Sequence, residues 1–501
     1  MSTISPGTIY LVGAGPGDPS LITLRGIECL ARADLVLYDY LVNRVILAHA
    51  RPGVQAVALG HHATAEKWPQ GEINRAMIDA ARGGKNVVRL KGGDPAVFGR
   101  LADEVTAIAA AGVPFEIVPG VTAGLAAASY AGIPITHADR SSAVALVTGH
   151  ERREKNAPPL DYEALADFPG TLIFYMGVTT SAKWTEALLR RGKPGDTPVA
   201  IVRRATWPDQ ETVKTTLAEL PRLVAERGIR PPAVVVVGDV AAADPLPPWF
   251  ENRPLFGRRV LVTRPRHQAC ELMRLLGDRG ADVLLEPAIE IAPPEDWQAV
   301  DRTIQRLGEF HWIVFSSANG VTHFLDRLME NADLRRLASV QIAAIGPGTA
   351  EELARYRLRA DRMPEEFRAE ALAAALTEEA AGRRFLLVRA SRGREVLAEQ
   401  LRAAGGAVEQ VVVYRSRDVE RASAEVAAAL DEGRIDWITV TSSAIAQSLA
   451  RMFGENLRRA RLASISPVTS ATLRQLGFEP AAEATVYTME GVVEAILASS
   501  R

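Results

Sequence analysis

The sequence Ile9-Tyr-Leu-Val-Gly-Ala-Gly-Pro-Gly-Asp18 joins a short apolar run to a turn that contains three glycines. The apolar run predicts a buried β-strand, and a helical pattern begins near Leu21. Glycine lets a ligand approach the backbone closely at the start of such a helix, although a purely structural turn fits as well. Because Pro16 occupies the second gap of a Gly-x-Gly-x-Gly spacing, the turn is neither a dinucleotide fingerprint nor a P-loop.

Five further apolar runs repeat this arrangement in the first half of the chain, and each is followed by turn residues and a longer helical pattern. These runs are Leu35–Tyr38, Val87–Leu90, Ala143–Val147, Thr171–Phe174 and Val234–Val237. Strands that alternate with helices are typical of parallel sheets with crossover connections. The sequence therefore predicts an α/β fold.

A proline-rich stretch interrupts this alternation. The segment Asp244-Pro-Leu-Pro-Pro-Trp-Phe-Glu-Asn-Arg-Pro254 holds four prolines, which neither continue a helix nor suit a central strand. We therefore expect a first domain over residues 1–248, with lobes of about 1–118 and 119–248. A linker over 249–256 and a second domain over 257–501 would follow.

The second half contains an internal duplication. Leu261-Val-Thr-Arg264 matches Leu386-Leu-Val-Arg389, and Trp312-Ile-Val-Phe-Ser-Ser317 matches Trp437-Ile-Thr-Val-Thr-Ser442, both at an offset of 125 positions. A repeat this long indicates two related domains rather than a solenoid. We expect a duplicated two-lobed α/β module, with lobe one over about 257–292 plus 416–501 and lobe two over about 293–415. A ligand is expected between the lobes.

The composition limits the class of protein. The chain has 501 residues with 48% hydrophobic and 24% charged residues, which is typical of globular domains. Its net charge of −2 argues against nucleic acid or an anionic membrane as a partner, so an anionic substrate must be bound by local groups of Arg and Lys. Only Cys29 and Cys270 are present, and no run approaches about 18 apolar residues. We expect a cytoplasmic protein with no bound metal.

Further motifs in the first half each follow a strand. They are Arg89-Leu-Lys-Gly-Gly-Asp-Pro95 with Val97-Phe-Gly-Arg100, Val118-Pro-Gly-Val-Thr-Ala123, Gly132-Ile-Pro-Ile-Thr-His137, Val147-Thr-Gly-His150 and Phe174-Tyr-Met-Gly177. Loops at the carboxyl ends of parallel strands surround one crevice, so these motifs are expected to converge. With the first turn, they make residues from about 9 to about 240 resemble the tetrapyrrole methylases, and within them uroporphyrinogen-III C-methyltransferase.

This resemblance implies two α/β lobes that hold S-adenosylmethionine between them, usually in a homodimer. Nine positions match the family's donor contacts: Pro16, Gly92, Gly93, Asp94, Val97, Thr122, Ala123, Met176 and Ala205. In that role Asp94 accepts from ribose hydroxyls, the glycines leave room for adenosine, and Met176 packs on its ring. Each residue taken alone also fits a turn or a core position.

The resemblance also implies two proton-transferring residues. Asp39 matches the family's proposed proton acceptor, although an aspartate at a strand end also serves as a helix cap. Where the family has Gly-Lys-Arg this chain has Gly60-His-His62, so His61 replaces the proposed proton-donating lysine. Imidazole also donates near neutral pH. Methyl transfer itself depends mainly on positioning and on the exclusion of water.

Small polar residues at strand ends, together with arginines, mark the second half. They are Thr263, Arg264, Ser316, Ser317, Asn319, Thr349, Arg389, Arg394, Thr441 and Ser442. Such a set suits a polycarboxylate, because Arg forms paired bonds to carboxylates and helix N-termini favour anions, but capping hydroxyls and solvated arginines are the plainer interpretation. With the duplication, these motifs resemble uroporphyrinogen-III synthase over about 257–497.

The synthase resemblance implies a reaction without metal or organic cofactor. Hydroxymethylbilane loses water, its last pyrrole is inverted through a spiro intermediate, and the ring closes. Tyr414 matches the acid that helps the hydroxyl leave, and it also fits a half-buried tyrosine bonded to backbone.

Three hypotheses follow for the whole chain. The first joins two consecutive enzymes, so that uroporphyrinogen III made by the second half is methylated at C2 and C7 by the first half to give precorrin-2, on the way to sirohaem or a corrinoid. The second makes the first half a non-catalytic or altered-acceptor tetrapyrrole-binding module beside an active synthase. The third, a nucleotide-dependent oxidoreductase, is disfavoured because the first turn lacks Gly-x-Gly-x-x-Gly.

Overall fold

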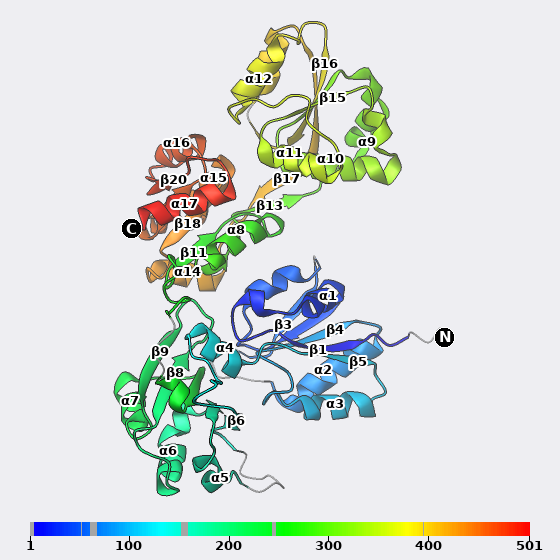
Figure 1. Cartoon of the computed structure of the whole chain (residues 1–501). Coiled ribbons are helices and arrows are strands. Elements are labelled where there is room, and N and C mark those ends of the chain that lie inside the picture. Colours follow the sequence, from blue (N-terminus) through cyan, green and yellow to red (C-terminus); the bar gives the residue numbers. More distant parts are fainter. Residues whose placement is uncertain are drawn as a thin grey trace. The chain divides into compact units, whose positions relative to one another are not determined.

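The computed structural model describes residues 5–51, 53–60, 68–151, 159–242, 247–393 and 395–500 (Figure 1). The chain divides into two compact units, Met1–Arg259 with Met273–Val283, and Val260–Leu272 with Leu284–Arg501. Its strands form four five-stranded sheets, and helices cover them. The prediction of an α/β fold is confirmed.

The first sheet is wholly parallel. Its strand order is β3(Gln55–Ala58), β2(Leu35–Tyr38), β4(Val87–Lys91), β1(Ile9–Gly13) and β5(Phe115–Val118). Helix α1(Leu24–Arg32) packs on one face, and helices α2(Gln70–Arg82) and α3(Leu101–Ala110) pack on the other. Because helices cover both faces of the sheet, the central strands are continuous apolar runs. Such runs are easy to recognise in the sequence.

The second sheet is mixed, so the prediction of parallel sheets is wrong for part of it. Its order is β6(Val144–Thr148), β7(Thr171–Tyr175), β10(Ala233–Val237), β8(Pro198–Arg203) and β9(Glu211–Thr216). Only β6 and β7 pair in parallel, whereas β10 and β9 run antiparallel to their neighbours. The connection from β8 to β9 spans residues 204–210, which is too short for a helical crossover.

All six strand predictions in this half are confirmed to within one residue at each end. The helices beside the second sheet are α4(Ala123–Tyr130), α5(Tyr162–Ala166), α6(Ser181–Arg190) and α7(Leu220–Arg227). Their apolar faces bury Trp184 completely, and its ring stacks on Phe174 at a centroid distance of 4.0 Å.

The second half of the chain forms the other two sheets. One has the order β12(Asp282–Leu285), β11(Arg259–Val262), β18(Trp437–Val440), β19(Arg461–Ser464) and β20(Ala482–Glu483). The other has the order β13(Ile289–Ala292), β17(Ala407–Asp418), β16(Arg384–Ala390), β14(Trp312–Phe315) and β15(Gln341–Ala344). Strands that match in the sequence repeat occupy matching places in the two sheets, which confirms the duplication.

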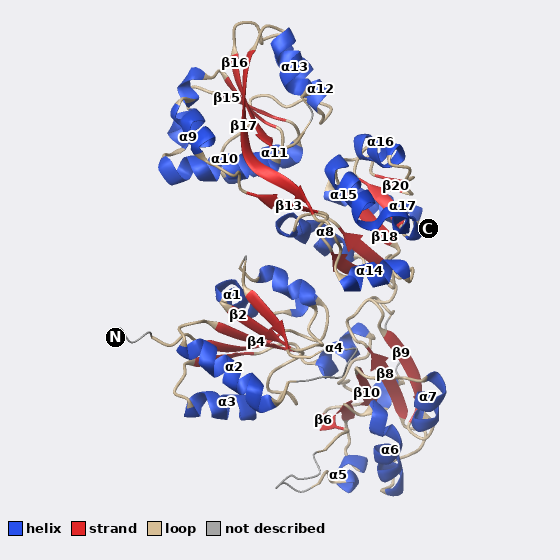
Figure 2. Ribbon diagram, turned by 180° about the vertical axis from the view of Figure 1, so that it is seen from behind, coloured by secondary structure: helices blue, strands red, loops and turns tan. Residues whose placement is uncertain are grey.

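Two extended strands connect the duplicated lobes. β13 pairs antiparallel with the last residues of β17, from Ile289 opposite Asp418 to Ala292 opposite Arg415 (Figure 2). The helices of this half are α8(Arg266–Asp278), α9(Gln298–Gln305), α10(Ala318–Asn331), α11(Pro347–Arg355), α12(Ala369–Thr377), α13(Val396–Ala403), α14(Ala424–Asp431), α15(Ser443–Phe453), α16(Pro467–Gln475) and α17(Met489–Ser499). Helices α10 and α15 begin 125 positions apart, as the repeat requires.

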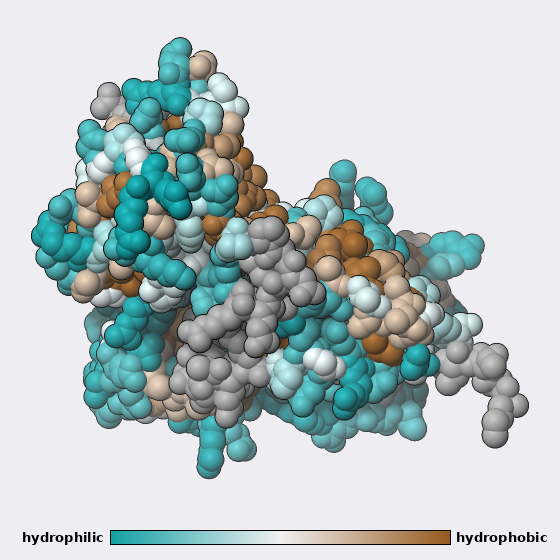
Figure 3. Space-filling view, turned by 90° about the horizontal axis from the view of Figure 1, so that it is seen from below, coloured by the Kyte–Doolittle hydropathy of each residue, from teal (hydrophilic) through white to brown (hydrophobic). Residues whose placement is uncertain are grey.

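The surface is polar with local apolar patches, as the face in Figure 3 shows. Leu24 of α1 is 81% exposed, and Phe115 and Ile117 of the edge strand β5 are also exposed. No helix among the described residues is long and apolar enough to cross a membrane.

Three glycines bring the loops after β1, β4 and β5 into backbone contact. A Cβ on Gly13 would lie 2.7 Å from the Gly93 carbonyl oxygen, and one on Gly120 would lie 2.4 Å from the same atom. The amide of Gly93 donates to the carbonyl of Gly15 at 2.8 Å. No side chain fits between these loops, so glycine is required at the contact.

We expect Gly120→Ala to lower the free energy of unfolding of the first unit by about 3 kcal/mol, because the added methyl group must displace backbone. Urea denaturation followed by circular dichroism measures the change. Gly71→Ala in α2 is the matched control, because nothing lies within 4 Å of its Cβ position. Equal stability of the two variants would contradict the close contact.

Candidate functional site

One cavity of about 540 Å³ in the first unit collects the residues that the sequence singled out. Its wall includes all nine positions matched to the methyl donor: Pro16, Gly92, Gly93, Asp94, Val97, Thr122, Ala123, Met176 and Ala205. Asp39 lines it too. The volume is in the range of small-molecule sites. The structure thus brings together, from both lobes, every described residue predicted for the methylase site.

Strained backbone concentrates around this cavity. Phe98, Arg100, Met176 and Arg204 have φ values between 47° and 59° and line its wall, and the neighbouring Thr206 has a φ of 68°. Arg357 is the sixth non-glycine residue with positive φ in the described part of the chain. Such conformations cost energy and persist where the surrounding structure enforces them, which is typical of functional sites.

The glycines of the region serve two different purposes. Positions for a Cβ on Gly92 and Gly93 have no neighbour closer than 3.6 Å, so these residues leave the cavity open. A Cβ on Gly17 would lie 2.3 Å from Nε1 of Trp207, whose indole N–H donates to the Pro16 carbonyl at 3.2 Å. At Gly13 and Gly17 the sequence predicted space for a ligand, but other atoms of the protein occupy that space.

Asp94 fixes two of the loops. Its Oδ1 accepts from the amide of Ala96 at 2.7 Å, and its Oδ2 accepts from the amide of Gly120 at 3.0 Å. Each carboxylate oxygen has a second lone pair, so bonds to a ligand hydroxyl are still available. The ribose contact expected of Asp94 stays a prediction.

A buried ionic cluster lies at one side of the cavity. Nη2 of Arg89 donates to Oδ1 of Asp39 at 2.5 Å, and its Nε donates to Oε1 of Glu104 at 3.2 Å. Nζ of Lys91 donates to Oε2 of Glu104 at 2.8 Å. The side chains of Arg89, Lys91 and Glu104 are at most 4% exposed, whereas that of Asp39 is 33% exposed. Asp39 is thus the member of the cluster most open to the cavity.

The charges of this cluster balance. Arg89 and Lys91 are two residues apart on β4 and point to the same face of the sheet. Their mutual repulsion is offset by the carboxylate of Glu104 between them. Burial, followed by the charge of Arg89, lowers the pKa of Lys91 below its ordinary value. Glu104 therefore determines where both cations lie.

Another part of the cavity wall is apolar and open. Met176 is 51% exposed and Phe98 is 42% exposed, and the ring of Phe98 lies 5.0 Å from that of Tyr175. The hydroxyl of Tyr175 accepts from the amide of Gly124 at 2.7 Å and lies 2.8 Å from Oγ1 of Thr122. Burial raises the pKa of Tyr175, so its hydroxyl stays protonated. This wall offers flat apolar surface to a ligand ring.

In the second half, Tyr414 of β17 lies among polar side chains. Its hydroxyl is 3.0 Å from Oγ of Ser317, and its ring stacks on His323 at a centroid distance of 5.6 Å. Burial raises the pKa of Tyr414, against the opposing effect of bonds to Ser317 and Asn319. The phenol therefore keeps its proton above the ordinary value of 10.0.

Contacts continue from Tyr414 to the other lobe. The amide nitrogen of Gln268 donates to Oδ1 of Asn319, and Nη2 of Arg264 is 3.5 Å from Oε1 of Gln268. Nη1 of Arg264 contacts the sulfur of Met489 at 3.0 Å, and its buried Nε has no hydrogen-bond partner among the described residues. Burial lowers the pKa of Arg264. A guanidinium with so few partners is suited to bind an anionic group.

Most of the other predicted synthase residues have structural roles. The fully buried hydroxyl of Thr263 donates to the Thr439 carbonyl at 2.6 Å, and Oγ of Ser316 donates to the Val388 carbonyl at 3.3 Å. Ser442 caps α15, and Thr349 is buried in α11. Arg389 bonds to Glu395 and Gln410. Thr441 directly precedes the cap of α15.

Two predicted residues lie outside the described part of the chain. They are His61 and Arg394.

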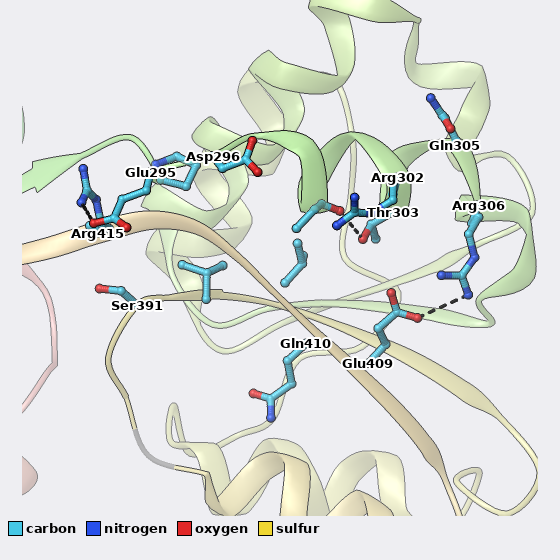
Figure 4. A pocket seen from close by; sticks show the side chains of 14 residues that line it. Glu295, Asp296, Arg302, Thr303, Gln305, Arg306, Ser391, Glu409, Gln410 and Arg415 are labelled. Atoms are coloured by element: carbon cyan, nitrogen blue, oxygen red, sulfur yellow. Dashed lines mark hydrogen bonds and ion pairs between the residues drawn. The ribbon is translucent and has the colours of Figure 1, made fainter.

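A second cavity, of about 760 Å³, lies in lobe two between α9 and β17 (Figure 4). None of the described residues predicted for the synthase lines it. The positive charges of its arginines are balanced by the carboxylates of Glu295, Asp296 and Glu409. Nη2 of Arg306 is 3.5 Å from Oε2 of Glu409. A polycarboxylate requires an excess of cations, so this cavity does not fit one.

Sequence reasoning missed several residues of the first cavity. Arg89, Lys91, Arg100, Arg204 and Trp207 also line it, and among the cations Arg100 and Arg204 lie outside the balanced cluster. Arg89, Lys91 and Arg100 lie inside motifs that the sequence had already indicated, so the positive charges within those motifs were the available signal. Nothing in the sequence marks Arg204 and Trp207.

We expect Glu104→Gln to lower the free energy of unfolding of the first unit by about 3–5 kcal/mol, because it leaves two buried cations with too little negative charge. Urea denaturation measures it. Glu226→Gln, at an exposed ion pair on α7, is the control and should change nothing measurable. Adding Lys91→Met to Glu104→Gln should recover part of the loss, and no recovery would contradict the charge balance.

The chain matches two family models. Residues 8–221 match the model described as Tetrapyrrole (Corrin/Porphyrin) Methylases. Residues 271–494 match the model described as Uroporphyrinogen-III synthase HemD. The two matches agree with the two resemblances found in the sequence.

Relatives combine or contain the same parts. Porphyrin biosynthesis protein HemD of Ruminiclostridium josui is 33% identical over 97% of this chain and 95% of its own length. Uroporphyrinogen-III C-methyltransferase of Bacillus subtilis is 38% identical over 68% of this chain and 69% of its own length. An S-adenosyl-L-methionine-dependent uroporphyrinogen III methyltransferase of Methanosarcina barkeri is 43% identical over 47% of this chain and 92% of its own length. The chain therefore belongs to the tetrapyrrole biosynthesis family in which a tetrapyrrole methylase is fused to a uroporphyrinogen-III synthase.

Proposed function

We propose that this chain catalyses two consecutive steps. The second half cyclises hydroxymethylbilane to uroporphyrinogen III, with loss of water and inversion of ring D. The first half methylates uroporphyrinogen III at C2 and C7 with S-adenosylmethionine to give precorrin-2. The observation that carries the proposal is the convergence of the nine donor positions and Asp39 on one cavity.

The cavity residues fit S-adenosylmethionine. Gly92 and Gly93 leave space beside the cavity, and Met176 offers an apolar surface for the adenine ring. When bound, the donor supplies a methyl group on a positively charged sulfur, which is already activated for transfer. The protein then has to orient the acceptor and exclude water, and the rigid loops at Gly93 and Gly120 suit that task.

Asp39 accepts the proton that the macrocycle must lose once a ring carbon has been methylated. Its side chain is partly open to the cavity, and the bond from Arg89 holds its carboxylate in place. Arg100 and Arg204, which line the cavity in solvent-accessible ion pairs with Asp103 and Asp209, provide positive charge for the substrate's carboxylates.

In the synthase half, Tyr414 donates the proton that lets the hydroxyl group leave. Arg264, whose Nε lacks a partner among the described residues, binds a substrate carboxylate. This half works without a cofactor in our proposal. The proposal also includes domain boundaries at 248 and 257 and a homodimer formed through the methylase half. It further includes a cytoplasmic location and the absence of a nucleic-acid partner.

Product analysis tests the proposal. We expect anaerobic incubation with hydroxymethylbilane alone to give a type III porphyrinogen, and addition of S-adenosylmethionine to add two methyl groups by mass. A type III product that gains no methyl group would contradict the methylase function and favour a tetrapyrrole-binding module. A product of type I would contradict the synthase function.

Asp39→Asn should lower kcat for methylation by about 10²-fold, because general-base catalysis is removed while the donor contacts remain. Steady-state kinetics and calorimetric titration with S-adenosylhomocysteine measure the two effects. Asp79→Asn, on the exposed side of α2, is the control. A donor affinity that falls as much as kcat would show that Asp39 binds the donor instead.

Tyr414→Phe should lower the synthase rate by about 10²-fold, because the phenol proton is lost. The wild-type rate should hold as the pH rises to 9, because burial keeps the pKa of Tyr414 above its ordinary value of 10.0 and the acid therefore stays largely protonated there. Tyr356→Phe removes a hydroxyl that donates to Asp326 at 2.6 Å and serves as the control. A rate unaffected by Tyr414→Phe would exclude the phenol as the acid.

A further inference from the structure

The segment that the sequence analysis assigns to a linker is packed against the first unit. Phe250 is 2% exposed and Leu255 is fully buried. The ring of Tyr130, at the end of α4, lies 4.7 Å from that of Phe250 and 4.9 Å from that of Trp249. The described residues 247–257 therefore form a structural part of the methylase half.

A relay of hydrogen bonds leads from this segment to the cavity. Nε2 of Gln210 donates to Oε1 of Glu251 at 3.0 Å and, over a longer 3.3 Å, to the carbonyl of Tyr130, and these bonds fix which way the Gln210 amide points. Oε1 of Gln210 then accepts from the backbone amide of Thr206 at 2.9 Å. Oγ1 of Thr206 in turn accepts from the backbone amide of Asp18 at 3.0 Å.

The end of the relay away from Glu251 holds parts of the cavity wall. Thr206 belongs to the strained turn in which Arg204 and Thr206 have φ values of 47° and 68°. Arg204, Ala205 and Trp207 of this turn line the cavity, and Trp207 donates to the carbonyl of Pro16, which also lines it. A turn with unfavourable φ angles keeps its shape only if neighbouring groups hold it.

The aromatic packing and the relay meet at the same loop. The hydroxyl of Tyr130 donates to Oδ2 of Asp18 at 2.8 Å, and the amide of the same Asp18 is held by Thr206. Asp18 ends the glycine-rich turn that begins after β1. The segment after the last strand of the methylase half thus reaches the first loop of that half by two routes.

We propose that Glu251 is a positioning residue for the methyl-donor site. It acts through Gln210 and Thr206 on the turn Arg204–Trp207 and on the loop that ends at Asp18. The proposal rests on the proposed function of the cavity, and it assigns to the fusion segment a part in donor binding rather than in connection alone.

The chemistry of the relay distinguishes three substitutions. Glu251→Ala removes the nearer of the two acceptors of the Gln210 amide, which is then held only by the longer bond to the Tyr130 carbonyl at 3.3 Å, so its oxygen is less firmly fixed toward Thr206. Glu251→Gln keeps an acceptor oxygen in the same place. Thr212→Val removes the other donor to the same oxygen of Glu251, whose bond is 2.8 Å long, and leaves the relay intact.

Titration of the full chain with S-adenosylhomocysteine by calorimetry tests the proposal. We expect Glu251→Ala to raise the Kd about tenfold, in keeping with the loss of one hydrogen bond to a charged group. Glu251→Gln and Thr212→Val should stay within about twofold of wild type, which is a small fraction of that effect. The synthase rate and the KM for uroporphyrinogen III should be the same in all four proteins.

The outcomes separate the possible explanations. If Glu251→Ala binds as well as wild type, or if Thr212→Val weakens binding as much as Glu251→Ala, the positioning role is wrong. If Glu251→Ala is too unstable to titrate, Gln210→Ala is titrated instead. This substitution breaks the same relay at the connection between β8 and β9, and it must raise the Kd for S-adenosylhomocysteine in the same way. A wild-type chain that binds no donor overturns the proposed function, and the inference with it.

Discussion

The backbone contact among Gly13, Gly93 and Gly120 is the constraint on which the methylase half depends. Three parallel strands end at the same edge of the first sheet, and their loops can meet there only because none carries a side chain at the contact. Asp94 then ties two of these loops together through the amide of Gly120. The cavity wall is consequently rigid on the side where Gly92 and Gly93 leave it open. A rigid wall lets a ligand bind without first ordering the loops.

Two carboxylates outside the cavity wall stabilise what the glycines bring together. Glu104 lies behind the wall and holds Arg89 and Lys91, and through Arg89 it fixes the carboxylate of Asp39. Glu251 accepts from Thr212 of the edge strand β9 and holds Gln210, and through it the strained turn at Thr206. Neither acid needs to touch a ligand for this. Both carboxylates show that side chains outside the cavity wall fix the positions of the residues that line it.

Much of this architecture follows from the sequence, and the exceptions have physical causes. Buried strands such as Val87–Lys91 stand out because both of their faces are apolar, and the repeat of Trp312 at Trp437 revealed the duplicated lobes. Strands β8 and β9 and the antiparallel direction of β10 were not foreseen, since a short connecting turn has no periodic signal. The positive φ of Met176 and Thr206 was equally hidden, because these residue types seldom adopt it. The partners of Glu104 and Glu251 are distant in sequence, and only the fold brings them close.

The central claim is that loops from both lobes of the first unit form one donor site. Hydrogen exchange of the full chain, with and without S-adenosylhomocysteine, tests it most directly, because each loop reports separately on ligand contact. The account predicts that amides in residues 13–18, 92–97, 119–123 and 204–207 gain protection together when the ligand is added. Protection confined to one of these loops, or found only in the second half of the chain, would contradict it.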